Sequence, residues 1–146
     1  MNKKIITHLN LLITTLIYIT YPLVLFYLIY TRDERFWRVL LAPAISFVFV
    51  SMIRHYIDAP RPYEVKEIDP IIKKETKGNS FPSRHVFAAF VIATTVYFVS
   101  KPLGILLMFA GFLLAVLRVI GGVHFPRDVI VGAIIGIVSG VLGFYI

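Results

Sequence analysis

The chain has 146 residues, of which 58% are hydrophobic and 16% are charged, and its mean hydropathy is +0.83. This composition excludes a typical soluble domain, which is about 45–50% apolar and about 25% charged, and it excludes a disordered chain. Lys and Arg number 15 against 8 acidic residues, a surplus that fits a membrane, a nucleic acid or an anionic substrate, and the lack of cysteine excludes disulfides and thiolate chemistry. We expect one domain, residues 1–146, that carries its chemistry within the apolar segments.

The first apolar block covers residues 5–30 and has no charge apart from a possible one on His8. At about 1.5 Å per residue, it is long enough to cross a hydrocarbon core of about 30 Å. Lys3 and Lys4 precede it, as in a signal peptide, but the block is too long and no small-residue cleavage site follows. We therefore expect a retained membrane-spanning helix.

A second apolar block, residues 36–57, begins with Trp and Arg side chains that suit a membrane interface. Residues 58–80 differ in composition, because lysines, acids and three prolines make them the one substantial polar loop. We interpret Lys73, Lys74 and Lys77 as a solvated face of this loop, and the alternative is a contact with lipid head groups.

Three further apolar blocks follow the loop. They cover residues 86–100 (starting near Pro82), 103–120 and 126–146. Glycines recur every four residues along the last block, at 132, 136 and 140, and such a stripe allows close helix packing, although glycine merely tolerated in a membrane helix explains it equally well. The expected fold class is all-α: a polytopic bundle of about five transmembrane helices with one polar loop.

The charged and polar residues within these blocks lie at helix ends. A charge inside a membrane segment costs a few kcal/mol, so each such residue is a functional candidate. Helix parity places the end of the second block, the start of the third and the connection between the last two on one side of the bilayer. The residues gathered there are Arg54, Arg61, Ser83, Arg84, His85, Arg118, His124 and Asp128.

This set of residue types is suited to phosphate chemistry. Arginine is a permanently charged planar fork that matches phosphate oxygens, and helix starts near Pro82 and Pro126 add backbone donors. Two histidines can act as nucleophile and general acid, and Asp128, four residues after His124, can orient its ring. The arginines supply the positive charge that Mg²⁺ supplies in other phosphoryl-transfer sites.

The same residues resemble the three motifs of the type 2 phosphatidic acid phosphatase family, the membrane lipid phosphate phosphatases related to vanadium haloperoxidases. Residues 54–62 match Lys, six residues, Arg-Pro; residues 82–85 match Pro-Ser-Gly-His; and residues 117–128 match Ser-Arg, five residues, His, three residues, Asp. The resemblance covers about residues 54 to 128. This chain departs from the motifs at three positions: Arg54 replaces lysine, Arg84 replaces glycine and Leu117 replaces serine.

The resemblance implies a catalytic role for three residues. His124 would attack phosphorus and become phosphohistidine, His85 would protonate the leaving group and then activate water, and Asp128 would orient His124. The residues implied to bind the phosphate are Arg54, Arg61, Ser83, Arg84 and Arg118. No metal and no cofactor is expected, and the implied partners are the bilayer and a membrane lipid phosphate, with no nucleic acid, since no stacking module is present. The oligomeric state stays open.

Three functions fit the chain. The first is a membrane phosphatase acting on a lipid phosphate or diphosphate, such as polyprenyl diphosphate, phosphatidic acid or phosphatidylglycerol phosphate. The second is a catalytically weak or inactive family member that serves as a lipid-binding scaffold, which Arg84 in place of glycine favours. The third is a small transport or channel subunit; a pore would place charges at mid-helix, whereas these lie at helix ends.

The small chain is typical of a bacterial lipid-recycling phosphatase, which favours polyprenyl diphosphate or a related cell-envelope lipid. The positive-inside rule favours a cytoplasmic site, but four arginines on that side are explained by phosphate binding. The resemblance implies a site outside the cytoplasm. We therefore expect an integral protein of the bacterial plasma membrane with its site on the outer face.

Overall fold

The computed structural model describes residues 1–74 and 76–146, and it confirms the all-α fold. Four helices are long and apolar enough to cross a membrane: α1 (Lys3–Tyr30), α2 (Phe36–Ile57), α5 (Lys101–Ile120) and α6 (Pro126–Tyr145). Between α2 and α5 lie the single turn α3 (Pro62–Val65), within the polar loop, and the helix α4 (Arg84–Tyr97). Five helices therefore form the bundle, and four of them are long spans.

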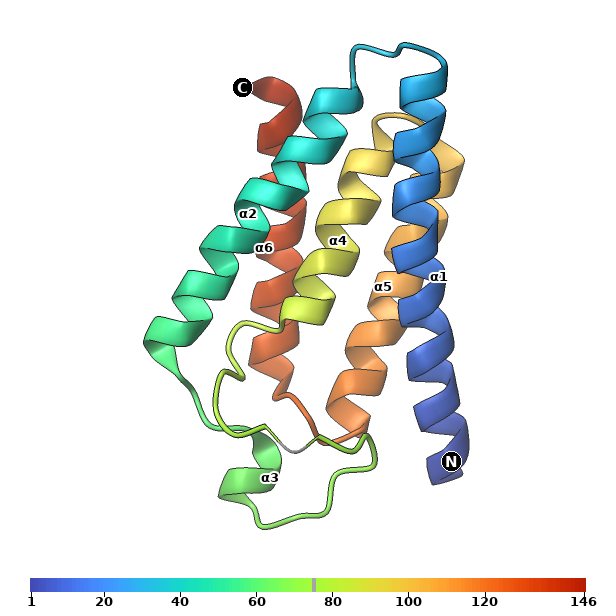
Figure 1. The fold of residues 1–146 in the computed structure, drawn as a ribbon. Coiled ribbons are helices and arrows are strands. Elements are labelled where there is room, and N and C mark those ends of the chain that lie inside the picture. Colours follow the sequence, from blue (N-terminus) through green and yellow to red (C-terminus); the bar gives the residue numbers. More distant parts are fainter. Residues whose placement is uncertain (75) are drawn as a thin grey trace.

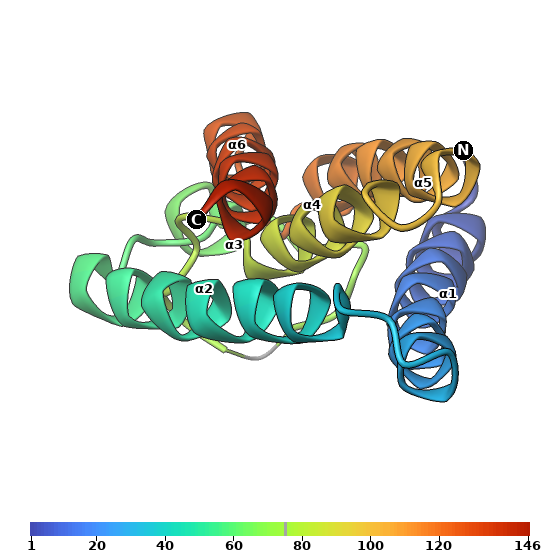
Figure 2. The ribbon, with the colours of Figure 1, turned by 90° about the horizontal axis from the view of Figure 1, so that it is seen from above.

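The helix α4 is shorter than the sequence predicted, since the apolar block continues to residue 100. Its 14 residues span about 21 Å, which is less than a hydrocarbon core of about 30 Å. Most of its side chains are buried because α1, α2, α5 and α6 all pack against it (Figure 2). It is the central helix of the bundle, and its apolar composition reflects protein contacts on all sides.

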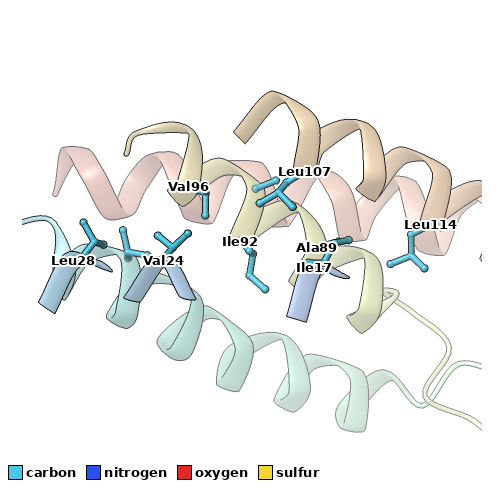
Figure 3. Packing of buried hydrophobic residues seen from close by; sticks show 10 residues of the cluster. Ile17, Val24, Leu28, Ala89, Ile92, Val96, Leu107 and Leu114 are labelled. Carbon is cyan, nitrogen blue, oxygen red and sulfur yellow. The ribbon is translucent and has the colours of Figure 1, made fainter. Parts of the chain in front are cut away.

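Aliphatic side chains of α1, α2, α4 and α5 form the largest core cluster (Figure 3). Outside this cluster, large apolar side chains such as Phe26, Phe49 and Phe109 are exposed on the outer faces of the long helices. Lipid tails are as apolar as these side chains, so close packing holds such helices together. The labelled core residues are Ile17, Val24, Leu28, Ala89, Ile92, Val96, Leu107 and Leu114.

The glycine stripe of α6 faces α4, which confirms close helix packing as its role. A Cβ atom added to Gly132 would lie 2.7 Å from the carbonyl oxygen of Ser83, and one added to Gly136 would lie 2.7 Å from that of Phe87. The backbones of the two helices are therefore in contact. At the same end, the backbone N–H of Ser83 donates to the carbonyl of Asp128 at 2.9 Å, which joins the start of α4 to the start of α6.

The chain runs up and down so that sequence-distant segments meet at one end of the bundle (Figure 1). The N-terminus, α3 and the polar loop lie at that end, and the C-terminus lies at the other. The end of α2, the start of α4, the end of α5 and the start of α6 are all at the loop end, as helix parity predicts.

Candidate active site

Three buried side chains at the loop end form a hydrogen-bonded group. The Oδ2 atom of Asp128 accepts from the Ser80 hydroxyl at 2.5 Å. The Nδ1 atom of His124 lies 3.6 Å from the same carboxylate oxygen and 3.4 Å from the Ser80 Oγ. The exposed fraction of each side chain is 1% or less. Since Nδ1 faces Asp128, the other ring nitrogen, Nε2, is the one available for chemistry.

The turn between α5 and α6 places His124 and Asp128 together. Gly122 in this turn has φ +77°, a conformation that favours glycine, and Pro126 begins α6. Asp128 lies in the first turn of α6, where its Oδ2 also accepts the backbone N–H of Phe125 at 2.9 Å. The carboxylate is therefore fixed by the helix start as well as by Ser80.

The pKa of His124 is lowered to about 4, and burial is the largest cause. The hydrogen bond with Asp128 opposes this shift, whereas the nearby charges of Arg118 and Arg61 add to it. The imidazole is therefore neutral at pH 7, the protonation state in which it can act as a nucleophile.

The Arg61 guanidinium, 2% exposed, is held by three backbone carbonyls. Its Nε donates to Gly78 at 2.9 Å, and its terminal nitrogens donate to Val123 at 3.2 Å and to Asn79 at 3.4 Å. Glu64 supports the same region, since its carboxylate accepts the backbone N–H groups of Arg61 at 2.6 Å and Gly78 at 2.9 Å. Arg61 thus ties the polar loop to the residue before His124.

The side chain of Arg118 is buried at the same end of the bundle. It is 3% exposed, and its Nε and Nη2 atoms have no hydrogen-bond partner among the described residues. A buried donor without a partner is costly, and a guanidinium fork matches two phosphate oxygens. Arg54, also buried, uses one terminal nitrogen on the carbonyl of Asn79. These two arginines give this end of the bundle the character of an anion site.

The start of α4 contributes the second histidine. Ser83 is the N-cap residue, its hydroxyl accepting the Val86 N–H, and the first turn of a helix presents N–H groups that lack partners within the helix. His85 follows, half-buried, and the ring of Tyr18 from α1 stacks on it with 6.4 Å between ring centroids. The exposed Arg84 side chain extends toward α2, where its guanidinium lies 5.4 Å from the centre of the Phe47 ring.

The structure thus brings all the predicted site residues to one end of the bundle, and Arg84 is the one with an exposed side chain. It adds Ser80, Tyr18 and Lys74, which the sequence analysis did not select. No sequence signal marks Ser80, a single serine in a polar loop, and Tyr18 lies in an apolar block. The sequence predicts a solvated Lys74, but this residue is half-buried, unlike Lys73. No cluster of three His, Asp or Glu residues suited to a metal ion occurs within residues 1–74 and 76–146.

Solved structures of similar shape support the fold. LpxE from Aquifex aeolicus has 31% sequence identity and a TM-score of 0.81, and the match covers 99% of this chain and 86% of that one. The first transmembrane PAP2 type phosphatidylglycerolphosphate phosphatase from Bacillus subtilis has 20% identity and a TM-score of 0.79, covering 98% of this chain and 75% of that one. The second similarity concerns the fold alone.

A curated relative matches a shorter region. The bacitracin transport permease protein BcrC of Bacillus licheniformis is 33% identical over 78 residues, which is 53% of this chain and 38% of that protein. This chain therefore aligns with little more than a third of that relative. The PAP2 superfamily matches residues 35–146, a region that begins before α2 and contains every predicted site residue. On this match, the chain belongs to the PAP2 superfamily of membrane phosphatases.

Proposed function

We propose that this protein is an integral membrane phosphatase that hydrolyses a lipid phosphate or diphosphate through a phosphohistidine, without a metal ion. The observation that carries the proposal is that one end of the bundle holds both a buried, neutral His124 and a buried Arg118, whose Nε and Nη2 atoms have no hydrogen-bond partner among the described residues. The first supplies a nucleophile and the second an anion-binding fork. Membership of the PAP2 superfamily supports the class of reaction.

In the first step, His124 Nε2 attacks phosphorus, so that an N–P bond forms and the bond from phosphorus to the leaving oxygen breaks. Asp128, held by Ser80, fixes the tautomer of His124 and stabilises its positive charge. Arg118 binds the phosphate oxygens as charge develops on them. Arg54, Arg61, Ser83 and the backbone amides at the start of α4 complete the proposed phosphate site, with Arg84 beside them.

His85 has the complementary role in both steps. It protonates the leaving oxygen in the first step, and in the second it takes a proton from water, which attacks the phosphohistidine. The N–P bond then breaks, inorganic phosphate leaves, and His124 returns to its neutral form. One residue acting as acid and then as base leaves the enzyme unchanged after each turnover.

Trapping the phosphoenzyme tests these roles. An activated aryl phosphate needs little protonation of its leaving group, so His85→Ala should still become phosphorylated but hydrolyse the intermediate slowly, accumulating acid-labile, base-stable label. His124→Ala should carry no label. Label retained in His124→Ala, or found on another residue, would overturn the assignment.

Metal removal tests the second part of the proposal. Because arginines take the cationic role, activity should survive EDTA, and vanadate, which adopts the trigonal bipyramidal geometry of the transferring group, should inhibit competitively. Activity that EDTA abolishes and Mg²⁺ restores would contradict the mechanism.

Among substrates, we favour polyprenyl diphosphate or a related cell-envelope lipid over phosphatidic acid and phosphatidylglycerol phosphate. Assays of the purified protein on these lipids decide between them. Arg84 in place of the glycine of the motif favours the scaffold alternative, and its side chain extends toward α2. Lipid binding with no turnover of any of these lipids would favour that alternative.

We further propose that the protein lies in the bacterial plasma membrane with its site on the outer face. The chain has no cysteine, so single cysteines report topology directly. Lys73 lies in the loop and Lys101 at the start of α5 at the opposite end, and both are exposed. An impermeant maleimide should label Lys73→Cys on intact cells and Lys101→Cys only after permeabilisation. The reverse pattern would place the site in the cytoplasm.

A further inference from the structure

We propose that a basic cavity beside the start of α4 is a second phosphate subsite, which binds the leaving phosphate of a lipid diphosphate. This inference rests on the proposed phosphatase function and narrows its substrate class. In this subsite, Lys74 is the residue that distinguishes a diphosphate from a monophosphate substrate, and Lys77 and Arg84 are supporting cations.

The cavity has a volume of about 300 Å³. It lies between the last turns of α2, the loop segment that contains residues 74 and 76–79, and the first residue of α4. None of the described residues that line it is acidic. Its charged or titratable lining side chains are Arg54, His55, Lys74, Lys77 and Arg84.

The position of Lys74 shows that this positive charge is concentrated. Burial, together with the charges of the four site arginines at positions 118, 61, 54 and 84, lowers the pKa of Lys74 to about 7. A half-buried ammonium among like charges is unfavourable unless an anion lies between them. Lys73, the preceding residue, is exposed and does not line the cavity.

The cavity adjoins the proposed catalytic phosphate site on the side of the general acid. Arg54 lines the cavity and belongs to the phosphate site as well. Lys74 and Arg84 are close enough to His85 for their charges to act on its ring. Because His85 is the proposed donor to the leaving oxygen, an anion in this cavity would be the leaving group itself.

A diphosphate substrate would occupy both sites, with its terminal phosphate at His124 and its second phosphate in the cavity. When His124 attacks the terminal phosphorus, the N–P bond forms and the bridging P–O bond breaks. The electron pair stays on the bridging oxygen, which departs as part of a lipid monophosphate and takes its proton from His85. Negative charge therefore grows on the second phosphate, where Lys74 and Arg84 stabilise it. When the substrate is a lipid monophosphate, the leaving group is a neutral alcohol, which has no phosphate to occupy this subsite.

A matched pair of substrates tests the subsite in the full-length protein in detergent. Farnesyl diphosphate and farnesyl phosphate share one lipid chain and differ by one phosphate. We expect Lys74→Ala to lower kcat/KM for the diphosphate by about 10- to 100-fold, the effect of losing a charge-assisted hydrogen bond, and for the monophosphate by less than about 3-fold. Lys74→Arg should restore most of the difference. Lys73→Ala is the matched control and should change neither value.

Equal losses on both substrates would overturn the inference, because Lys74 would then serve the catalytic phosphate or the fold. Unchanged kcat/KM values of Lys74→Ala on both substrates would overturn the inference too. In either case, activity of the wild-type protein on these lipids would leave the proposed phosphatase function standing.

Binding of a substrate analogue that cannot be hydrolysed tests the subsite independently of the proposed phosphatase function. Farnesyl methylenebisphosphonate has a P–C–P linkage that cannot be hydrolysed, so its affinity can be measured without turnover. The subsite predicts that Lys74→Ala weakens its binding by a similar factor, while binding of farnesyl phosphonate changes little. That result in a protein without hydrolase activity would support the subsite and refute the proposed function. Equal binding of the bisphosphonate by wild type and Lys74→Ala would refute the subsite.

Discussion

The ring of Tyr18 stacks on the ring of His85, with 6.4 Å between their centroids and 23° between their planes. Tyr18 belongs to α1, which precedes the region matched by the PAP2 superfamily, and His85 lies in the first turn of α4. The first helix therefore contacts the proposed general acid directly, and the ring of Tyr18 limits the orientations that His85 can adopt.

This contact makes Tyr18 a positioning residue. Stacked rings contribute about 0.5–1.5 kcal/mol, so Tyr18→Leu should slow hydrolysis of a lipid phosphate by about 2- to 10-fold. Tyr18→Phe keeps the ring and should keep the rate. Phosphorylation by an activated aryl phosphate needs little acid catalysis and should change much less in Tyr18→Leu. Tyr27→Leu, an exposed change on the same helix, is the control. Equal losses on both substrates would show that the ring supports the fold alone.

Ser80 provides a second test, since its hydroxyl donates to Asp128 at 2.5 Å. Ser80→Ala removes a hydrogen bond to a charged group, and we expect kcat to fall by about 10-fold with little change in KM. Steady-state kinetics on a micellar substrate measure both constants, with Ser139→Ala on α6 as a control away from the site. A raised KM with unchanged kcat would indicate that Ser80 shapes the loop and does not hold Asp128 for catalysis.

The two arginines of the first motif should respond differently to lysine. Arg61 donates to three carbonyls, and one ammonium cannot reproduce that planar fork, so Arg61→Lys should lower both activity and the midpoint of thermal unfolding. Arg54→Lys keeps a charge near the phosphate and restores the residue of the motif, so it should retain much of the activity. Equal tolerance of both changes would contradict these assignments.

The pKa of His124, about 4, predicts the acid side of the pH profile. An unperturbed histidine has a pKa near 6.5, so burial extends the range of the neutral nucleophile downward by more than two pH units. The rate of phosphoenzyme formation, corrected for ionisation of an aryl phosphate, should fall only near pH 4. Asp128→Asn removes an interaction that raises this pKa, so the reduced activity should fall at still lower pH.

A fall near pH 6.5 that Asp128→Asn does not move would show that His124 is not the titrating nucleophile. The same pKa also affects stability. Between pH 6.5 and about 4 the unfolded chain binds a proton at His124 that the folded chain does not, so this contribution to stability decreases as the pH falls through that window.

The sequence predicts the bundle well because each long helix corresponds to a continuous apolar block with polar residues at its ends. Parity along those blocks then places His85 and His124 at one end without any knowledge of packing. The predicted end of α4 is wrong because hydropathy reports burial and does not distinguish a helix from the turn that follows it. Residues 98–100 continue the apolar block, yet α4 ends at Tyr97.

The residues that the sequence could not identify are those whose role depends on a partner from another segment. Ser80 meets Asp128 across 48 positions of sequence, and Tyr18 meets His85 across a helix contact. Lys74 resembles its neighbour Lys73 in type and context, and only the path of the loop turns one toward the cavity and the other toward solvent. Periodicity and motif spacing carry no information about such contacts.

The backbone contact between α4 and α6 has a consequence for how this protein can diverge. Because main-chain atoms set the separation of the two helices at Gly132 and Gly136, the positions of their starts do not depend on which side chains face the lipid. Substitutions on the outer, lipid-facing surface should therefore leave the geometry at the loop end unchanged, whereas a larger residue at Gly132 or Gly136 should push the two helix starts apart.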